Sequence, residues 1–578
     1  MTSKTPTFNV ALNAIFDTLV PHERTCAWCG EKFQVEKEDI DFYRMLRVPP
    51  PTWCPECREK RRFGHLMRMM KFFKRPCSAP GHSENVISVI PPAAPHKTFD
   101  FSYWHSDAWD AATFGCAYDV AKPFGEQFRA LFLDVPHVPL ERDPAAVNSD
   151  YAVGGTASKN VYFSGMALDC ENIFYSYDSR YSHDLVDCNE VSNSGNCYGA
   201  ICSAYSERCR FIIGCSHCLD CDFLYECKHC SHCFMSANLR NKSYMFRNEQ
   251  LSKEEYEERM REIRTGERIQ IEALHKEFED VMARSLRRAV QTVHTTDSVG
   301  DSLSECNRCF FAFRSEKVEN ARYVANVFSA HDLMDTLNNI QTEQSYENIV
   351  IGWGSKNYFS MYLRHSSSME YCSECLRCAD CFGCVGLKDK KFHIFNVPHP
   401  EDEYWRRVDE LKTAMLARGE YGEFFPLTLG LFPYQTSNAQ KEFPITEKEA
   451  QQREIPWYAE SSSDISTNLR VRKAPAEVPK DIKDVTDGIL NDAIACEVSG
   501  KPFRITKDEL AFYRKMELPL PTKHPWERMR ERGRWEHGFW LSPFMCPKCK
   551  EQSWSVYNKE EQRRFEIYCE SCYLKEVI

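Results

Sequence analysis

Small or apolar residues recur at every twelfth position in the middle of this chain, and a polar residue usually precedes each of them. A fixed short period predicts a solenoid, in which each coil stacks on the previous one and the inward side chains form a continuous core. Coils of twelve residues have room only for small inward side chains, and cysteine suits that place because it is compact and readily buried. The apolar series is Val161, Ile173, Leu185, Cys197, Cys209, Cys221 and Cys233, and the polar series is Asn160, Asn172, Asp184, Asn196, Arg208, Asp220 and His232.

The pattern occurs twice. A shift of 148 residues carries Val161 onto Cys309, with no net insertion between residues 149–264 (the first copy) and residues 297–412 (the second copy). The sequence therefore predicts a mainly β fold with some helix: two tandem short-coil β-solenoids of twelve residues per coil, each followed by a helix, with zinc modules at both ends.

Helices are predicted at the ends of the copies and before them. Ser252 and Glu255 form a capping-box pattern at the end of the first copy, and Pro400 precedes an acidic first turn in the second. Apolar periodicity predicts helix at the start of 123–140, before the first copy, and over 272–290, before the second.

Four cysteines near the N-terminus have the spacing of a zinc site. Cys26 and Cys29 form one CxxC pair, and Cys54 and Cys57 form another, with 24 residues between the pairs. Two such pairs can place four thiolates around one zinc ion at about 2.3 Å each. Since four cysteines complete the coordination shell, this zinc is expected to be structural.

A second set of four cysteines lies at the C-terminus. Cys546 and Cys549 are followed, after nineteen residues, by Cys569 and Cys572. This spacing is typical of a zinc ribbon, and it predicts a second structural zinc ion. The cofactor prediction is therefore two Zn²⁺ in all.

Two further modules have lost most of these cysteines. A shift of 470 residues carries the first finger onto a C-terminal segment in which Cys496 and His524 are the only two ligands left, so at most a weak metal site is expected there. Behind the first finger, Cys77 is kept, but Phe99 and Ser102 stand where a second pair would be. Each end of the chain is thus predicted to carry two finger folds, of which one binds metal.

These patterns divide the chain into eleven segments. They are an N-terminal extension (1–23), a treble clef (24–75), a degenerate zinc ribbon (76–112), a helical connector (113–148), the first copy (149–264), a second connector (265–296), the second copy (297–412), a C-terminal extension of the repeats (413–457), a linker (458–490), a degenerate treble clef (491–540) and a zinc ribbon (541–578).

A basic segment with interleaved phenylalanines follows the first finger. Basic side chains can neutralise phosphates and aromatic rings can stack on unpaired bases, so the segment is a candidate nucleic-acid surface. The alternative is a helix with a buried stripe of Leu66, Met69, Met70 and Phe73 and a solvated basic face. The candidate binding residues are Arg58, Lys60, Arg61, Arg62, Arg68, Lys71, Lys74 and Arg75.

Composition narrows the classes of function. The chain has 578 residues, with 73 Lys and Arg against 84 Asp and Glu, so its net charge of −11 permits only local basic patches. No run of about 18 apolar residues predicts a membrane span. The 29 cysteines, without an export signal, favour thiols and metal sites in a reducing cytoplasm.

No catalytic motif is present. The chain has no Walker loop, GxGxxG, HExxH or GxSxG, so no catalytic residue and no nucleotide or flavin cofactor is predicted. Gly352-Trp353-Gly354 is only a weak glycine pair, and His65, His82 and His105 show no ligand spacing. The Cys-x2-Cys-x2-Cys runs of the copies could bind an iron–sulfur cluster, but stacked columns explain them without metal.

Two stretches carry a resemblance to a known family. GEYGEFFP (Gly419 to Pro426) and YCESCYLKEV (Tyr568 to Val577), together with the finger and repeat patterns, make the chain similar to uncharacterised cysteine-rich repeat proteins of uncultivated bacteria with treble-clef and zinc-ribbon ends. The first finger resembles the probable zinc-ribbon domain. The resemblance implies zinc binding and no established activity.

Three hypotheses for function follow. The first is a non-enzymatic zinc-binding scaffold that binds RNA or a ribonucleoprotein through its zinc modules and residues 58–75. The second is a protein–protein interaction or assembly scaffold. The third is an iron–sulfur or thiol redox protein. No small-molecule substrate is indicated.

Overall fold

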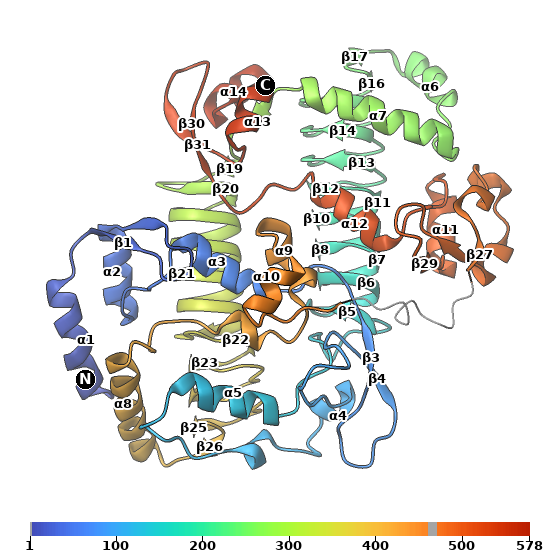
Figure 1. Cartoon of the computed structure of the whole chain (residues 1–578). Helices are drawn as coiled ribbons and strands as arrows, with labels where there is room; N and C mark the ends of the chain where they lie inside the picture. The colour runs from blue at the N-terminus through green and yellow to red at the C-terminus, as the bar shows by residue number, and fades with distance from the viewer. Residues whose placement is uncertain (1–2, 460–470, 578) are drawn as a thin grey trace.

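The two copies lie side by side and run in opposite directions (Figure 1). This computed structural model describes residues 3–459 and 471–577. The first copy rises from β5 (Tyr151–Val153) to β17 (Glu249–Gln250), and the second descends from β20 (Val299–Ser304) to β26 (Val397–Pro398).

Side-chain contacts between the copies follow the same antiparallel order. The Arg180 guanidinium lies 3.9 Å from the Phe328 ring, and Arg314 forms an ion pair of 2.6 Å with Glu190. As the residue number rises in the first copy, the number of its partner in the second copy falls.

Parallel strands with a step of twelve residues build the first copy. Val161 pairs with Ile173, and Ile173 pairs with Leu185, so the spacing seen in the sequence is the register of the strands. The strands after β5 are β6 (Lys159–Leu168), β7 (Glu171–Phe174), β8 (Tyr177–Arg180), β9 (His183–Val186), β10 (Asn189–Ser192), β11 (Gly195–Tyr198), β12 (Ile201–Ala204), β13 (Arg210–Ile213), β14 (Asp222–Tyr225), β15 (Phe234–Ala237) and β16 (Met245–Phe246).

The predicted fold class, a β-solenoid, requires correction. Hydrogen bonds join eight parallel strands into a closed barrel in the order β6-β7-β9-β11-β13-β12-β10-β8, and β8 returns to β6. The ring closes because the long strand β6 pairs with both β7 and β8, and β13 pairs with both β11 and β12. The remaining strands extend this sheet. The spacing predicts which residues pair, but it carries no signal for the β11–β13 bond that closes the ring.

A left-handed backbone at every third residue turns the chain. Asn160 and Asn172 have positive φ, as do the residues three positions apart between them. Each is followed by a buried residue, for example Val161 and Ser164. Left-handed backbone costs roughly 1–2 kcal/mol for most residues, and Asn and Asp adopt it most readily. The polar residues that precede the apolar positions therefore suit the turn, although Phe163 and Met166 adopt the same backbone.

Cysteine and serine are interchangeable at the buried positions that recur every twelve residues. Cys218 Sγ donates to the Ser216 carbonyl (3.6 Å), and one coil earlier Ser206 Oγ donates to the Ala204 carbonyl (3.1 Å). We therefore expect Cys218→Ser to leave the denaturation midpoint nearly unchanged, whereas Cys218→Leu should destabilise the chain by about 1–3 kcal/mol through overpacking. Equal losses in urea unfolding of the two variants would contradict this account.

The second copy has the same step. Ile349 pairs with Met361, and Met369 pairs with Cys381. Its strands form two sheets of four, β19-β20-β21-β22 and β23-β24-β25-β26. The strands not yet given are β19 (Thr292–Val293), β21 (Asn307–Ser355), β22 (Met361–Arg364), β23 (Ser367–Glu370), β24 (Ala379–Phe382) and β25 (Lys391–Ile394).

The predicted helices are present. The Ser252–Glu255 capping box begins α6 (Lys253–Arg261), and Pro400 precedes α8 (Glu401–Ala417) with its acidic first turn. The helix predicted before the first copy is α5 (Phe124–Asp134), and the one before the second is α7 (Arg268–Arg284).

Short elements on either side of the copies complete the chain. Of the predicted linker 458–490, residues 460–470 lie outside the described residues. No helix in the described ranges is long and apolar enough to cross a membrane. The N-terminal elements are α1 (Pro6–Thr18), β1 (His22–Thr25), β2 (Lys32–Val35), α2 (Lys37–Leu46), α3 (Pro55–Gly64), β3 (Phe73–Pro76), β4 (Asn85–Ser88), α4 (Phe101–His105) and η1 (Ala111–Phe114). The later ones are β18 (Arg287–Arg288), η2 (Leu427–Leu429), η3 (Tyr434–Thr436), α9 (Asn438–Glu442), α10 (Glu447–Gln452), β27 (Val471–Lys473), η4 (Pro475–Glu477), η5 (Ile482–Asp484), η6 (Asp487–Asn491), β28 (Ala493–Ala495), β29 (Pro502–Phe503), α11 (Lys507–Lys515), α12 (Pro525–Gly533), β30 (Ser542–Met545), β31 (Gln552–Ser555), α13 (Lys559–Arg564), β32 (Ile567–Tyr568) and α14 (Glu570–Val577).

Candidate metal centres and interdomain cleft

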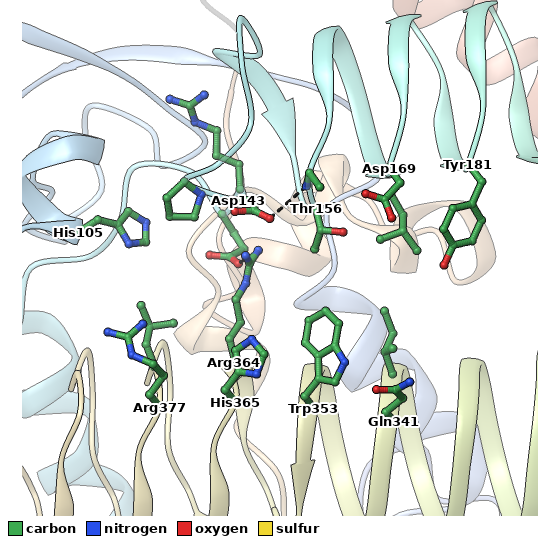
Figure 2. A pocket seen from close by; sticks show the side chains of 17 residues that line it. His105, Asp143, Thr156, Asp169, Tyr181, Gln341, Trp353, Arg364, His365 and Arg377 are labelled. Atoms are coloured by element: carbon green, nitrogen blue, oxygen red, sulfur yellow. Dashed lines mark hydrogen bonds and ion pairs between the residues drawn. The ribbon is translucent and has the colours of Figure 1, made fainter.

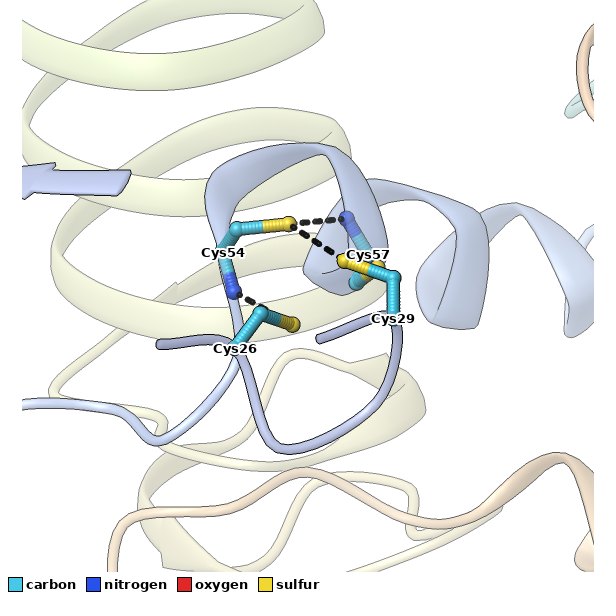
Figure 3. Close-up of side chains that lie close together, drawn as sticks. All are labelled: Cys26, Cys29, Cys54 and Cys57. Carbon is cyan, nitrogen blue, oxygen red and sulfur yellow. Dashed lines mark hydrogen bonds between the residues drawn. The ribbon is translucent and has the colours of Figure 1, made fainter. Parts of the chain in front are cut away.

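The four N-terminal cysteines form one compact cluster (Figure 3). Cys26 and Cys29 lie in the turn after β1, and Cys54 caps the N-terminus of α3. The four sulfurs lie within 4.8 Å of one another, and Cys29 Sγ is 3.9 Å from Cys54 Sγ. A tetrahedral ion with metal–sulfur bonds of about 2.3 Å separates its sulfurs by about 3.8 Å. The cluster could therefore hold one metal ion without rearrangement.

Hydrogen bonds reach two of these sulfurs from the backbone. The N–H of Cys54 donates to Cys26 Sγ (3.2 Å), and that of Cys57 donates to Cys54 Sγ (3.5 Å). The hydrogen bond with the Cys57 side chain, more than any other contact, lowers the pKa of Cys54 to about 5. A low thiol pKa favours the form that binds metal.

The C-terminal cluster repeats this geometry. Cys546 follows β30, and Cys569 stands between β32 and α14. Cys549 Sγ is 3.7 Å from Cys569 Sγ, and the N–H of Cys569 donates to Cys546 Sγ (3.4 Å). Burial opposes ionisation of Cys546, but backbone N–H bonds from Cys569, Cys549 and Lys548 lower its pKa to about 6. With Cys572, these cysteines form a second set that could hold a metal ion.

The weak metal site predicted at Cys496 and His524 contains only these two candidate ligands in the described part of the chain. The His524 N–H donates to Cys496 Sγ (3.2 Å), so the finger geometry survives. His524 Nδ1, however, accepts the N–H of Trp526 (3.1 Å) and caps α12. Among the described residues, no third His, Cys, Asp or Glu joins this pair in a cluster that could hold a metal.

The arginines of the basic segment after the first finger are buried inside the protein. Arg58, Arg61 and Arg62 are 1–2% exposed, and they form ion pairs with Asp335 and Glu347 of the second copy, both fully buried. The Nε of Arg58 is 2.8 Å from Asp335, and an Arg61 nitrogen is 2.9 Å from Glu347. The arginines attach α3 to β21 by charge.

The rest of the segment is also largely covered. Arg68 forms a buried ion pair with Glu536, and Arg75 donates to the His96 carbonyl (2.5 Å). Lys74 is exposed. All five arginines among the eight candidate residues are therefore buried, so they offer neither an exposed nucleic-acid surface nor a solvated basic face. Lys60, Met69 and Lys71 are half-buried, and Leu66, Met70 and Phe73 are buried. The predicted helical stripe is nevertheless wrong, because α3 ends at Gly64 and Phe73 lies in β3.

A cleft of about 540 Å³ lies between the two copies (Figure 2). Asp169 and Tyr181 face it from the first copy, and Trp353, His365 and Arg377 face it from the second. The Trp353 and His365 rings stack with centroids 4.9 Å apart and planes within 7°. Tyr181 is 56% exposed, so the cleft presents aromatic surface to solvent.

The cleft has balanced charge. Arg364 pairs with Glu141 (2.5 Å), and Arg377 pairs with Asp389 (2.6 Å). Burial, followed by the nearby Arg364, lowers the pKa of His105 to about 4, so its ring is neutral near pH 7. Each of these guanidinium groups already has a carboxylate partner.

Sequence reasoning missed this cleft. In the sequence, Trp353 stands out only as part of the weak glycine pair Gly352-Trp353-Gly354. Gln341, Trp353, His365 and Arg377 nevertheless follow one another by twelve residues, and all have positive φ. The signal was the same twelve-residue step, applied to the residues that point outward.

Comparison with known proteins does not assign this chain to a family. No family model matches the chain, and no curated protein matches it. Among solved structures, a candidate acetyltransferase from Desulfovibrio desulfuricans G20 is 10% identical, with 44% of this chain and 70% of that chain covered and a TM-score of 0.10. A likeness at this level shows neither the fold nor the activity of this chain.

Proposed function

We propose that this chain is a non-enzymatic, zinc-binding scaffold for protein–protein interaction, and that the cleft between the copies receives the partner protein. The observation that supports this proposal most directly is the cleft, which aromatic side chains of both copies line beside paired charges. Aromatic and arginine side chains are enriched where proteins bind one another.

Zinc bound by the two four-cysteine clusters would stabilise the fold and would not take part in catalysis. Four thiolates leave no open coordination position, and tetrahedral thiolate sites are typical of structural zinc. The buried ion pairs of α3 then connect the first cluster to the second copy. A reducing compartment such as the cytoplasm suits this role, since the cysteines are free thiols. The resemblance to cysteine-rich zinc-ribbon proteins agrees with a structural role for zinc.

The balance of charge favours a protein over RNA. Nucleic acid binding depends on cations that neutralise phosphates, and the cleft's arginines already have carboxylate partners. The Trp353 and His365 rings also contact each other, so a base cannot insert between them. A thiol redox role has less support, because the cysteines of the copies are mostly buried and buried thiols are inert.

We expect Trp353→Ala with His365→Ala to reduce partner binding about 30-fold or more, the effect of removing a central aromatic anchor. Tagged protein is purified from its own cells after nuclease treatment, and bound proteins are quantified. The matched control is Tyr205→Ala with His217→Ala. This is the equivalent stacked pair of the first copy, with centroids 4.7 Å apart, and it does not line the cleft.

Partner protein retained by the control and lost from the cleft variant supports the proposal. Equal retention by both variants contradicts the cleft as the binding site. In a parallel preparation without nuclease, RNA that stays on the wild type at physiological salt and is lost from the cleft variant would replace the protein proposal with an RNA one.

A further inference from the structure

A third group of metal-ligating side chains lies in the loop between β3 and β4. Cys77, His82 and Glu84 each offer a ligand atom, and these atoms lie within 4.8 Å of one another. Cys77 is 9% exposed, whereas His82 is half-buried and Glu84 is exposed. We propose that these three side chains bind a third zinc ion, with its fourth coordination position open to solvent.

The backbone around Cys77 shares one hydrogen bond with the knuckles of the two four-cysteine clusters. In the C-terminal cluster the N–H of Cys546 donates to the carbonyl of Glu551, five residues later (3.0 Å). The N–H of Cys26 donates to Glu31 at the same spacing (2.8 Å). The N–H of Cys77 makes the same bond seven residues later, to Glu84 (3.0 Å). The Cys77 knuckle is thus the same turn with two residues inserted.

The insertion accounts for the histidine. The second cysteine of a CxxC pair stands three residues after the first, as Cys549 does after Cys546. Two inserted residues move this position to the fifth residue after Cys77, which is His82. A search for CxxC spacing misses it, although histidine is as ordinary a zinc ligand as cysteine.

Glu84 occupies the position that closes the knuckle. Its carboxylate is 2.6 Å from His82 Nδ1, and carboxylates commonly orient a zinc-binding imidazole or bind the ion themselves. Glu551 is its counterpart in the C-terminal cluster, where its carboxylate lies 3.8 Å from Cys549 Sγ.

The other half of the site explains why one position is open. The N–H of Asp100 donates to Cys77 Sγ (3.1 Å), as that of Cys569 donates to Cys546 Sγ. Asp100 therefore stands where the third cysteine of a ribbon would be, one residue after the Phe99 expected from the sequence. Its carboxylate accepts the N–H groups of Ser102 and Tyr103 and caps α4. Three protein ligands then remain, and zinc sites with three protein ligands keep an exchangeable fourth.

Metal content per chain tests this site. The full chain, purified anaerobically and equilibrated with zinc before gel filtration, is expected to hold three zinc ions, and His82→Ala is expected to hold two. His82 is half-buried, so its loss should leave the fold intact. Cys77→Ser should give the same count. The matched controls are His294→Ala and Cys116→Ser, which remove an exposed histidine and an exposed cysteine outside the clusters.

The order of metal release adds a second readout. One ion of the wild type should leave first under a mild chelator, because the site has one thiolate where the others have four. This fast phase should be absent from His82→Ala. Two ions in the wild type, or the same count in the wild type and His82→Ala, would overturn the proposal. The count does not depend on whether the cleft binds protein.

Discussion

Cys54→Ser is expected to release one zinc ion per chain and to unfold the first finger. Cys54 belongs to the four-cysteine cluster and caps α3. Serine is a weak zinc ligand but a good N-cap residue, so the variant removes a ligand and leaves the start of the helix capped. Structural zinc contributes roughly 10–16 kcal/mol to small zinc domains, which is more than a finger of this size can replace by packing. Hydrogen–deuterium exchange should show fast exchange across residues 22–64, with the metal count lowered by one.

The control for this variant is Cys116→Ser. Cys116 is exposed and belongs to none of the clusters that could hold a metal among the described residues. Its metal count and exchange pattern should match those of the wild type. If Cys54→Ser kept all its zinc and its slow exchange in α3, the first cluster would not be a structural metal site.

Glu347→Gln should cost about 3–5 kcal/mol of stability at the contact between the finger and the second copy. Glu347 is fully buried, and its carboxylate lies 2.9 Å from Arg61 and 3.3 Å from Arg62. A neutral amide leaves two buried guanidinium groups short of a counter-charge, and an uncompensated buried charge is expensive. The measurement is the denaturation midpoint, with limited proteolysis at the segment after α3 to locate the loosened contact.

A nearby acid gives the control for the ion-pair cluster. Glu343 is exposed, and Glu343→Gln should change stability by no more than about 0.5 kcal/mol. Replacing both partners, as in Arg61→Met with Glu347→Leu, should recover part of the loss, because apolar pairs often substitute for buried ion pairs. Equal effects of Glu347→Gln and Glu343→Gln would mean that the buried ion pairs do not hold the finger in place.

Local spacing predicted what is local in the structure. Cys26 and Cys54 come together because each CxxC pair is a tight turn, and the twelve-residue step is the register of neighbouring strands. Arg58 shows the limit. Its partner Asp335 lies 277 positions further along the chain, so a segment that is basic in sequence is neutral in the fold.

Two other errors have equally physical causes. The closure of eight strands depends on one pairing, Tyr198 with Arg210, which repeats the usual step of twelve and so carries no distinguishing signal. The CxxC pattern does not identify His82 as a ligand because two inserted residues change the spacing. The backbone hydrogen bond from the Cys77 N–H to the Glu84 carbonyl nevertheless keeps the turn.

The antiparallel arrangement of the two copies also constrains how many residues each copy can contain. Every twelve residues added to one copy would shift its later residues by one strand, and neighbouring strands lie about 4.8 Å apart. Arg314 would then miss Glu190, and Phe328 would miss Arg180, since these partners are matched in reverse order along the two copies. An insertion of twelve residues can therefore be absorbed only if the opposite copy gains one at the facing level. The two copies can therefore change length only together.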